Sequence, residues 1–538
     1  MNTKSDTWKK GIVYQIYPRS FKDSNADGIG DIPGIISKLD YVKNLGIDMI
    51  WLSPVYGSPN DDNGYDVSNY VGINPEYGTM DDMDLLIKEA KHRDMKIIMD
   101  LVINHTSDEH PWFIESKNPM SPYRDYYIWA KKPNNWTSFF GGSAWDQVGD
   151  SYYLHLFSKK QPDLNWNNPK VMEEIQKIMR FWLDKGIYGF RCDVINIIYK
   201  SSLEDGKKRF VLTGKEHYHS QEGCHEILRR LRSEVLSDYD AFTVGETVMV
   251  TPKEANDLIH PERKELDMVF SFEHMETDQI NNKWFKTKFN PNKFMKTIAR
   301  WQQEVYWNAN YLENHDQPRS VSRFGDDKKY HYESATMLAT LNLTLKGTPF
   351  IYQGQEIGMT NGDFKSLDEY QDVETHRIYQ IARRLHFPKW YIKKMIERTS
   401  RDNARQPMQW DDTSGFSKGK PWLKINANQS VINVFKQERE DNSILRYYKT
   451  LIGLRKSSKT LTSGSFKPLY MKHGVFIYQR YDDKKTYCIV LNMTKRPRRV
   501  PVKFKGSVLL SNYGVTQLSS HRLMPFEALV ILEDIIHD

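Results

Sequence analysis

Cysteine is scarce in this sequence of 538 residues, which contains only Cys192, Cys224 and Cys488. The three are widely separated, odd in number and outside the spacings that metal-binding motifs use, so the sequence predicts neither a disulfide framework nor a zinc site. Such sparse use of cysteine is typical of a reducing compartment. We therefore expect three inert thiols in the core.

Long apolar runs and a strong charge imbalance are also missing. No uninterrupted apolar stretch could span a bilayer, and residues 1–11 are polar and lack the apolar core of a signal peptide. The net charge of +7 is modest for this length and spread along the chain, so nucleic acid is not suggested as a partner. We expect a cytoplasmic protein without membrane contact; its oligomeric state is open, with a monomer favoured.

The sequence does contain the residues for a large core, with 39% hydrophobic and 13% aromatic side chains. Short apolar runs alternate with amphipathic helical patterns, among them those at 32–45, 81–93 and 172–185. Eight such strands alternating with helices predict an α/β fold of the (β/α)8 TIM barrel type. The predicted strands are 13–17, 47–53, 95–102, 190–194, 242–246, 266–272, 308–313 and 348–352.

Two regions depart from this alternation. The segment after the third strand is aromatic, rich in Pro, Asn and Gly, and too long for an ordinary connection, which indicates a small inserted domain. Near the C-terminus, short alternating runs at 475–481, 486–492, 500–504 and 528–532 predict an antiparallel β-sandwich. The predicted domains are a barrel in 1–104 and 169–460, an inserted domain B in 105–168, and a C-terminal β-sandwich in 461–538.

The stretch Gly189-Phe-Arg-Cys-Asp193 ends the fourth predicted strand. Side chains alternate along a strand, so Arg191 and Asp193 should point to the same face, where the guanidinium would keep the carboxylate ionised. Taken alone, such a pair is as often structural as functional. The functional interpretation requires other carboxylates at the same place.

Three further strand ends supply polar side chains. Glu246 follows the apolar run 242–244, where burial should raise its pKa, as a general acid requires. His105 follows the third strand, and the pair His315 and Asp316 follows the seventh. In a barrel the C-terminal strand ends converge, and two carboxylates facing one bond are the apparatus of glycoside hydrolysis.

Aromatic residues could stack on a sugar there or fill the inserted domain's own core; these are Tyr65, Trp145, Phe157 and Trp166.

The segment from Asp23 to Asp31 has oxygen-bearing side chains at positions one, three, five and nine, and glycine at six. This spacing begins like an EF-hand calcium loop, but Gly34 stands where an EF-hand needs glutamate. We expect a bound cation, with an Asx-rich turn as the alternative.

Four stretches resemble, in order and spacing, the characteristic regions of the α-amylase family, glycoside hydrolase family 13. They are Asp100-Leu-Val-Ile-Asn-His105, Gly189-Phe-Arg-Cys-Asp193, Gly245-Glu246 and Asn314-His-Asp316. The segment Gln161-Pro-Asp-Leu-Asn-Trp166 is similar to the oligo-1,6-glucosidase and α-glucosidase branch of this family. Further segments agree with that branch: Ser53-Pro-Val-Tyr56, Asp62-Asn-Gly-Tyr-Asp66, Gln353-Gly-Gln-Glu-Ile-Gly358 and Arg401-Asp-Asn-Ala-Arg405.

The resemblance implies a role for each matching residue. Asp193 would be the nucleophile, Glu246 the acid/base, and Asp316 the carboxylate that grips the sugar hydroxyls. Val194, directly after the nucleophile, resembles the residue that accompanies α-1,6 preference. The implied sugar-binding residues are Tyr65, Asp66, His105, Phe157, Arg191, His315 and Arg405, and the implied ligands of structural Ca²⁺ are Asp23, Asn25, Asp27, Asp31 and the carbonyl of Ile29. No organic cofactor is implied.

The implied activity is that of an exo-acting retaining α-glucosidase, which removes α-1,6-linked glucose from short isomalto-oligosaccharides. A trehalose-6-phosphate hydrolase shares almost every motif, and it would need cations such as Lys283, Lys286 and Lys288 for the phosphate. A sucrose-active isomerase is less favoured, because Arg319-Ser-Val-Ser-Arg323 lacks the charged loop of that group. A non-catalytic transporter heavy chain would have a membrane anchor and would have lost the catalytic carboxylates.

Overall fold

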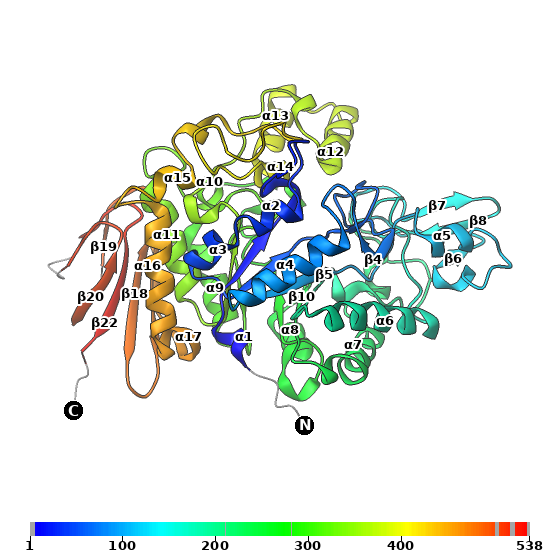
Figure 1. Cartoon of the computed structure of the whole chain (residues 1–538), viewed down its shortest axis with the longest axis horizontal. Helices are drawn as coiled ribbons and strands as arrows, with labels where there is room; N and C mark the ends of the chain where they lie inside the picture. Colours follow the sequence, from blue (N-terminus) through cyan, green and yellow to red (C-terminus); the bar gives the residue numbers. More distant parts are fainter. Residues whose placement is uncertain (1–5, 210, 281, 501–504, 517–521, 535–538) are drawn as a thin grey trace. The chain divides into compact units, whose positions relative to one another are not determined.

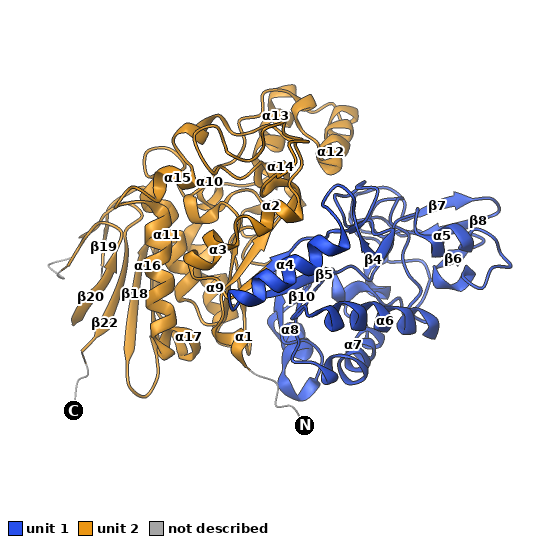
Figure 2. Cartoon of the chain, in the orientation of Figure 1, with its two compact units in different colours: residues 1–5, 51–271 blue, residues 6–50, 272–538 orange. Residues whose placement is uncertain are grey.

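The computed structural model describes residues 6–209, 211–280, 282–500, 505–516 and 522–534. The chain divides into two compact units (Figure 2), unit 1 with residues 1–5 and 51–271 and unit 2 with residues 6–50 and 272–538. Figure 1 labels the helices and strands along the chain.

The sheet of unit 1 is built from parallel strands. These are β5 (Lys96–Leu101), β9 (Gly189–Cys192), β10 (Phe242–Glu246) and β11 (Met268–Phe270), each paired with the next. Nearly all of their residues are buried, as expected for parallel strands covered on both faces. Gly189 is required here, because a Cβ at this position would lie 1.9 Å from the carbonyl oxygen of Phe242 on the neighbouring strand.

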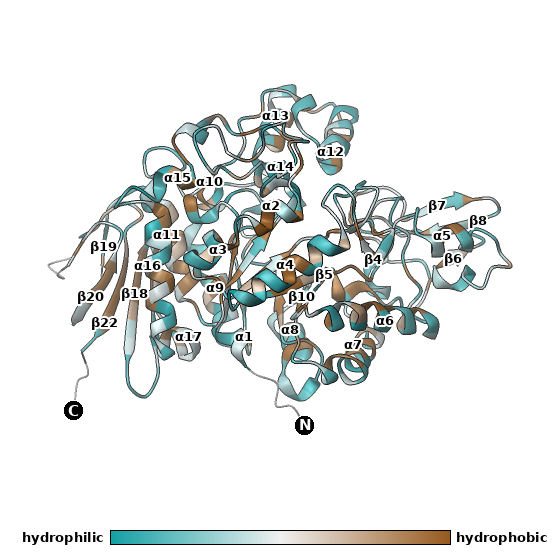
Figure 3. Ribbon diagram, in the orientation of Figure 1, coloured by the Kyte–Doolittle hydropathy of each residue, from teal (hydrophilic) through white to brown (hydrophobic). Residues whose placement is uncertain are grey.

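Helices of unit 1 follow the sequence signals closely. Helix α4 (Met80–His92) begins with a capping box between Thr79 and Asp82, and buries Met83, Leu86 and Ala90 on one face. Figure 3 shows both apolar and polar residues along this helix. Helix α6 (Pro169–Lys185) ends at Gly186, whose φ of 101° is the left-handed C-cap conformation that glycine adopts without strain. The remaining longer helices are α7 (Glu222–Glu234) and α8 (Pro252–Ile259).

The long segment between β5 and α6 forms a small sheet of its own. Its strands β6 (Trp129–Ala130), β8 (Ser151–Leu154) and β7 (Trp145–Val148) are antiparallel in that order, preceded by α5 (Pro111–Ser116). This is where the sequence predicts the inserted domain B, whose boundaries at 105 and 168 stay predictions.

Unit 2 contains a second group of parallel strands, β1 (Val13–Ile16), β15 (Thr348–Tyr352) and β14 (Ala309–Asn310). Helix α11 (His331–Thr344) is buried on all sides from Ser334 onward, and the hydroxyls of its buried Thr336, Thr340 and Thr344 donate to backbone carbonyls of the same helix. Helix α16 (Ile444–Ser457) packs beside it, and α9 (Pro291–Glu304) and α10 (Ser320–Phe324) complete this part of the unit.

The eight strands of the main sheet, including β2 (Met49–Leu52), are neighbours in the order β11-β10-β9-β5-β2-β1-β15-β14. This arrangement of strands with intervening helices confirms the predicted α/β barrel class.

The C-terminal part of unit 2 is a five-stranded antiparallel sheet in the order β16-β17-β18-β22-β20. Its core includes Ile477, Cys488, Val490 and Ile531. The short strands β19 (Arg498–Arg499) and β21 (Arg522–Leu523) pair separately. Residues 501–504 of the predicted strand 500–504 lie outside the described residues. The sheet strands are β16 (Ser465–Lys472), β17 (Val475–Tyr481), β18 (Thr486–Asn492), β20 (Gly506–Ser511) and β22 (Ala528–Glu533).

Three expectations about local structure were wrong in detail. The predicted helix 32–45 is two helices, α2 (Ile32–Ile36) and α3 (Leu39–Leu45), because the Ser37 hydroxyl donates to the Gly34 carbonyl and ends the first. The predicted strand 190–194 ends at Cys192, and the strand 308–313 shortens to Ala309–Asn310.

The three cysteines are free and buried, as expected. Within the described ranges, no helix has both the length and the apolar character needed to cross a membrane.

Candidate active site

One guanidinium organises the predicted catalytic residues of unit 1. Arg191 Nη1 lies 2.6 Å from Asp193 Oδ1, and Arg191 Nη2 lies 2.7 Å from Glu246 Oε2. The same Nη1 pairs with Asp100 Oδ1, and all four side chains are at least nine-tenths buried. Because two nitrogens of one planar group hold the two predicted catalytic carboxylates, Asp193 and Glu246 lie close together.

Strand register explains this convergence. Arg191 on β9 is paired with Asp100 on β5 and with Val244 on β10. Residues two apart on a strand share a face, which brings Glu246 to the side that Val244 and Arg191 share. Strand pairing therefore places Arg191, Asp100 and Glu246, while Asp193 lies in the turn directly after β9, where its backbone N–H donates to the Leu101 carbonyl at 3.0 Å.

Burial and charge oppose each other at this cluster. Burial raises the pKa of Asp193 to about 6 against the lowering effect of Arg191, and burial likewise raises the pKa of Asp100 to about 6. Burial would lower the pKa of Arg191, but Asp100 and Glu246 raise it well above its ordinary value. Three carboxylates share one permanent cation, so a proton can be held among them near neutral pH.

Val194 turns the chain directly after the predicted nucleophile. Its φ of 37° and ψ of 40° are left-handed, an uncommon and strained conformation for a β-branched residue. The turn directs its backbone N–H toward Glu246 Oε2, at 3.3 Å. Its side chain is 6% exposed and belongs to a cluster that includes Trp136, Ile197 and Tyr218.

Tyr65 and His105, two predicted sugar-binding residues, lie in the same unit. The Tyr65 hydroxyl is 3.4 Å from Asp100 Oδ2 and 3.5 Å from Arg191 Nη1. His105 Nε2 is 3.0 Å from the carbonyl of Tyr65, and the ring contacts Phe157 at a centroid distance of 5.3 Å. The structure therefore brings Tyr65, His105 and Phe157 together beside the Arg191 cluster.

Asp66 is fully buried, and its carboxylate accepts hydrogen bonds from the backbone N–H groups of Asp61 and Asp62. Burial raises its pKa to about 7 despite these bonds. A buried carboxylate on a loop beside Tyr65 is suited to bind sugar hydroxyls.

Two aromatic candidates are structural residues of the inserted region. Trp145 lies in its hydrophobic cluster, and Trp166 is buried with its indole N–H bonded to the Ile103 carbonyl at 2.8 Å. Of the two interpretations that the sequence left open for Trp145 and Trp166, these contacts favour packing in the core of the inserted region. Phe157 is only half-buried.

Asp316 in unit 2 is held by three basic side chains. His315 Nε2 is 3.0 Å from Asp316 Oδ2, while Arg405 Nη2 and Arg401 Nη1 are 2.8 and 3.4 Å from Oδ1. Desolvation would raise the pKa of Asp316, but His315, Arg401 and Arg405 together hold it well below its ordinary value. Asp316 is therefore ionised at neutral pH.

His315 and Arg405 are themselves fixed. His315 Nδ1 lies 2.8 Å from the Gln15 amide nitrogen, and its ring is stacked on Tyr17. Arg405 donates through Nε to the His315 carbonyl. Its Nη1 is buried and has no hydrogen-bond partner among the residues that the structure describes, which leaves one donor for a ligand.

Sequence reasoning gave Arg401 no role and missed Asp372. Asp372 Oδ1 accepts from Nε and Nη2 of Arg401, at 3.0 and 2.7 Å, and Asp372 also caps helix α12 (Val373–Arg384). Arg401 stands four residues before Arg405 in a quoted motif, which could have indicated a shared site. No local signal relates Asp372 to Arg401, since 29 residues separate them.

A second missed group supports His105. The buried Lys200 ammonium is 2.6 Å from Asp163 Oδ2 and 2.8 Å from Asn104 Oδ1. Asn104 in turn contacts His105 Nδ1 at 3.1 Å. These contacts fix the orientation of the His105 ring through its Nδ1 atom.

The predicted cation loop folds into a series of Asx turns. The Asp23 carboxylate accepts the backbone N–H groups of Asn25, Ala26 and Gly28, and Asp31 Oδ2 accepts from Ser24. The all-oxygen donor set suits a hard cation such as Ca²⁺. However, no three His, Cys, Asp or Glu side chains gather as a metal site within the described part of the chain. The loop has suitable donor chemistry, and the cation stays a prediction.

Comparison with known proteins is consistent with this geometry. The alpha-amylase catalytic domain matches residues 15–464. An oligo-1,6-glucosidase of Parageobacillus thermoglucosidasius is 50% identical over 555 residues, covering 97% of this chain and 98% of that protein. An oligo-1,6-glucosidase of Halalkalibacterium halodurans is 49% identical, covering 98% of both chains. The crystal structure of a trehalose-6-phosphate hydrolase from Bacillus licheniformis has a TM-score of 0.93 and 41% identity, covering 98% of this chain and 100% of that chain. The chain therefore belongs to the alpha-amylase family.

Proposed function

We propose that this protein is a glycoside hydrolase that removes α-1,6-linked glucose from the non-reducing end of short isomalto-oligosaccharides, with retention of configuration. The observation that carries the chemistry is the single guanidinium of Arg191 bound to both Asp193 and Glu246. The substrate class is supported by relatives named oligo-1,6-glucosidase, which match at 50 and 49% identity over nearly the whole chain.

In the proposed mechanism Asp193 attacks the anomeric carbon, and an ester bond forms as the glycosidic bond breaks. Glu246 donates its proton to the leaving oxygen in the same step. In the second step Glu246 takes a proton from water, the water oxygen bonds to the anomeric carbon, and the ester to Asp193 breaks. Arg191 stabilises the carboxylates throughout, and Asp316, ionised by its basic neighbours, is proposed to bind the hydroxyls of the reacting glucose.

We propose sugar-binding roles for the other predicted residues as well. Tyr65 would stack on the glucose, while Asp66, His105 and His315 would bind its hydroxyl groups. The buried Nη1 of Arg405, which has no hydrogen-bond partner in the described part of the chain, supports a role in binding a ligand oxygen. Exo action is the expected consequence if these residues enclose a single glucose.

Rates of hydrolysis of isomaltose, maltose, sucrose, trehalose and trehalose 6-phosphate, measured side by side, test this function. Isomaltose should be the best substrate, and proton NMR should show α-glucose as the first product. A preference for another of these sugars, or release of β-glucose, would overturn the proposal.

Trehalose-6-phosphate hydrolysis is the main alternative, and two of its expected phosphate ligands are engaged elsewhere. Lys283 pairs with Glu374. Lys286 is 3.1 Å from Asp278, with only 5% of its side chain exposed. Neither of these two ammonium groups is available to a phosphate without breaking an ion pair, which leaves the exposed Lys288 of the three.

We propose a cytoplasmic setting, which the sparse use of cysteine supports, and no nucleic-acid or membrane partner, which the modest net charge supports; the oligomeric state is open, with a monomer favoured. We also propose that the loop 23–31 binds structural Ca²⁺, and that no organic cofactor is needed, since the acid and nucleophile come from the chain itself.

A further inference from the structure

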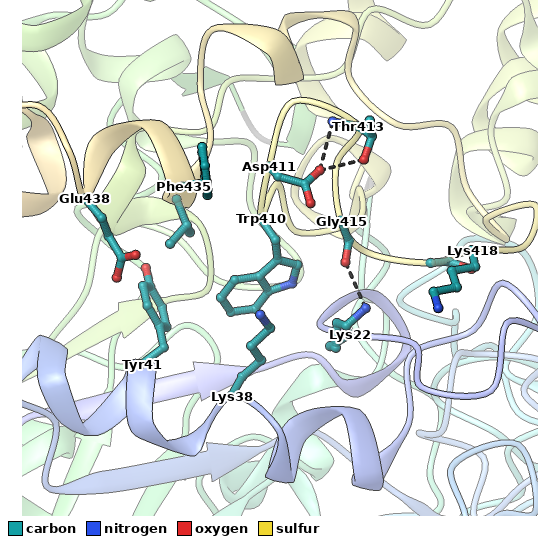
Figure 4. A pocket seen from close by; sticks show the side chains of 12 residues that line it. Lys22, Lys38, Tyr41, Trp410, Asp411, Thr413, Gly415, Lys418, Phe435 and Glu438 are labelled. Atoms are coloured by element: carbon teal, nitrogen blue, oxygen red, sulfur yellow. Dashed lines mark hydrogen bonds between the residues drawn. The ribbon is translucent and has the colours of Figure 1, made fainter.

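Unit 2 contains a cavity of about 540 Å³ that shares no residue with the predicted active site. Its walls come from Lys22, from helix α3 with Lys38 before it, from residues 410–418, and from helix α15 (Val434–Gln437) with Glu438 after it (Figure 4). Trp410 stands at the centre of this view, with Glu438 and Tyr41 on one side and Asp411 on the other. We call it the Trp410 pocket.

Hydrogen bonds and ring contacts hold two walls of the Trp410 pocket in place. The Trp410 indole N–H donates to the Phe21 carbonyl at 2.7 Å, and its ring packs edge-on against Phe21 and Tyr41, each at 5.1 Å. Lys22 donates to the carbonyls of Gly415 and Phe416 and thereby ties the loop to the wall. A ligand does not have to order walls that are fixed in this way. Less conformational entropy is therefore lost when it binds.

Lys38 presents an unsatisfied donor to the pocket. Its ammonium lies 4.4 Å from the centroid of the Trp410 ring. Within the described chain it has neither a hydrogen-bond acceptor nor an ion-pair partner, although the residue is half-buried. Burial and the neighbouring Lys22 lower its pKa, and the Asp411 and Glu438 carboxylates of the same pocket act in the opposite direction. A ligand that supplies an acceptor oxygen would stabilise it.

The same pocket presents acceptors. Asp411 Oδ1 accepts from Thr413, whereas Oδ2 has no described donor, and no described side chain donates to the Glu438 carboxylate. Lysines and carboxylates thus line one cavity without forming ion pairs with each other. An anion would meet Asp411 and Glu438, and a cation would meet the lysines, so an ionic ligand of either sign is repelled by part of the wall. A neutral molecule with many hydroxyl groups can donate to the carboxylates and accept from Lys38.

Phe435 adds an apolar surface of the kind that covers the C–H face of a sugar. Its side chain is 53% exposed at the rim, and Arg439 lies 3.5 Å from the ring centroid and holds it in place. We propose that the Trp410 pocket is a second, non-catalytic binding site for a short neutral oligosaccharide. The identification of the sugar as an isomalto-oligosaccharide rests on the proposed function. The existence of the binding site does not depend on that function.

The test uses the full chain carrying Asp193→Asn, so that sugar is bound without turnover. Isomaltotriose is titrated by calorimetry in the presence of excess 1-deoxynojirimycin, a glucose mimic that fills the active site. We expect millimolar binding to persist, and to weaken at least tenfold when Lys38→Met or Phe435→Ala is added. Lys436→Met, which removes the same charge from the helix that carries Phe435 but lies outside the pocket, should leave binding unchanged.

The proposal is overturned if the iminosugar abolishes all isomaltotriose binding, or if Lys38→Met and Lys436→Met behave alike. It is also overturned in favour of an anion site if 10 mM inorganic phosphate displaces the sugar from the iminosugar-blocked protein. Lys38→Met should not change the hydrolysis rate on isomaltose in the otherwise unmodified enzyme. If the proposed activity is wrong, the failure appears only in the hydrolysis assay on isomaltose. The binding test is independent of that activity, because Asp193→Asn binds sugar without turnover and maltotriose is titrated as a second probe.

Discussion

The side chains of Arg191, on strand β9, and Asp193, in the turn that follows it, form an ion pair in which Nη1 lies 2.6 Å from Oδ1. The other terminal nitrogen of Arg191 holds Glu246 at 2.7 Å. A single buried cation therefore stabilises the predicted nucleophile and the predicted acid at once, and the reactivity of the site depends on how these carboxylates share it.

Asp193→Asn should remove nearly all turnover, since a neutral amide cannot form the glycosyl ester. Glu246→Gln should lower kcat by about 10²- to 10⁴-fold, the usual contribution of a general acid. Both are measured on isomaltose, with a circular-dichroism melt as the control for folding. Near-normal activity of Asp193→Asn, after deamidation is excluded by mass spectrometry, would refute its assignment as nucleophile.

The pH dependence of kcat/KM should have an acid limb between pH 6 and 7. Burial raises the pKa of Asp193 to about 6 and that of Asp66 to about 7, and each must be ionised to act as proposed. Raising the pH through this range deprotonates both groups and should increase the rate, with a slope above one if both ionisations are required. A limb centred near pH 4 would show that neither raised pKa governs the free enzyme.

Asp372→Asn should lower kcat/KM by about tenfold or more, because it weakens a charge-assisted contact that fixes Arg401 on Asp316. Asparagine is as good a helix N-cap as aspartate, so helix α12 should still form. Glu374→Gln is the matched control, because it removes a carboxylate charge that lies farther from Arg401. The ion-pair distance to Arg401 is 3.6 Å for Glu374 and 2.7 Å for Asp372.

A positioning role for Asp372 predicts a change in the acid limb of the pH profile and a partial recovery in Asp372→Glu. Equal losses in Asp372→Asn and Glu374→Gln, with an unchanged profile, would indicate a merely structural effect.

Removal of a bound cation should lower the melting temperature without changing kcat. Calcium at about 100 times its dissociation constant would stabilise the fold by about 2.7 kcal/mol, which EDTA would remove. Asp27→Asn keeps the oxygen that accepts the Ile29 N–H but loses a charge, so its melting temperature should respond less to EDTA. Identical melting curves with and without EDTA, together with no metal by elemental analysis, would make the loop an Asx-rich turn only.

Val194→Ala or Val194→Thr should raise activity on maltose relative to isomaltose. A methyl-sized obstruction is worth roughly 1–3 kcal/mol, so the ratio could change by about 10- to 200-fold. The physical reason is that an α-1,6 bond has an extra rotatable methylene, which lets the second ring avoid the branched side chain. An unchanged ratio would place the choice of linkage elsewhere, with residues 247–250 the next segment to vary.

The sequence alone determined the main sheet and the order of its polar strand ends. Short apolar runs form strands, Thr79 begins a helix and Gly186 ends one. These signals act over a few residues, so the elements that they specify depend little on the rest of the chain. The expected pairing of Arg191 with Asp193 is present, although β9 ends at Cys192 and Asp193 lies in the turn after it. Their pairing with Glu246 followed from the expectation that parallel strands end together.

Tertiary structure decided the contacts that no local pattern encodes. Asp372 reaches Arg401 over 29 residues, and Lys38 reaches Trp410 from the opposite end of the chain, because packing of distant segments selects these partners. It also decided that Trp145 fills the inserted region's core and that Val194 leaves the strand in a left-handed turn. Side-chain type and periodicity predict which residues can be buried or charged; only the packed chain determines which of them meet, since each contact must offset the desolvation of the groups that make it.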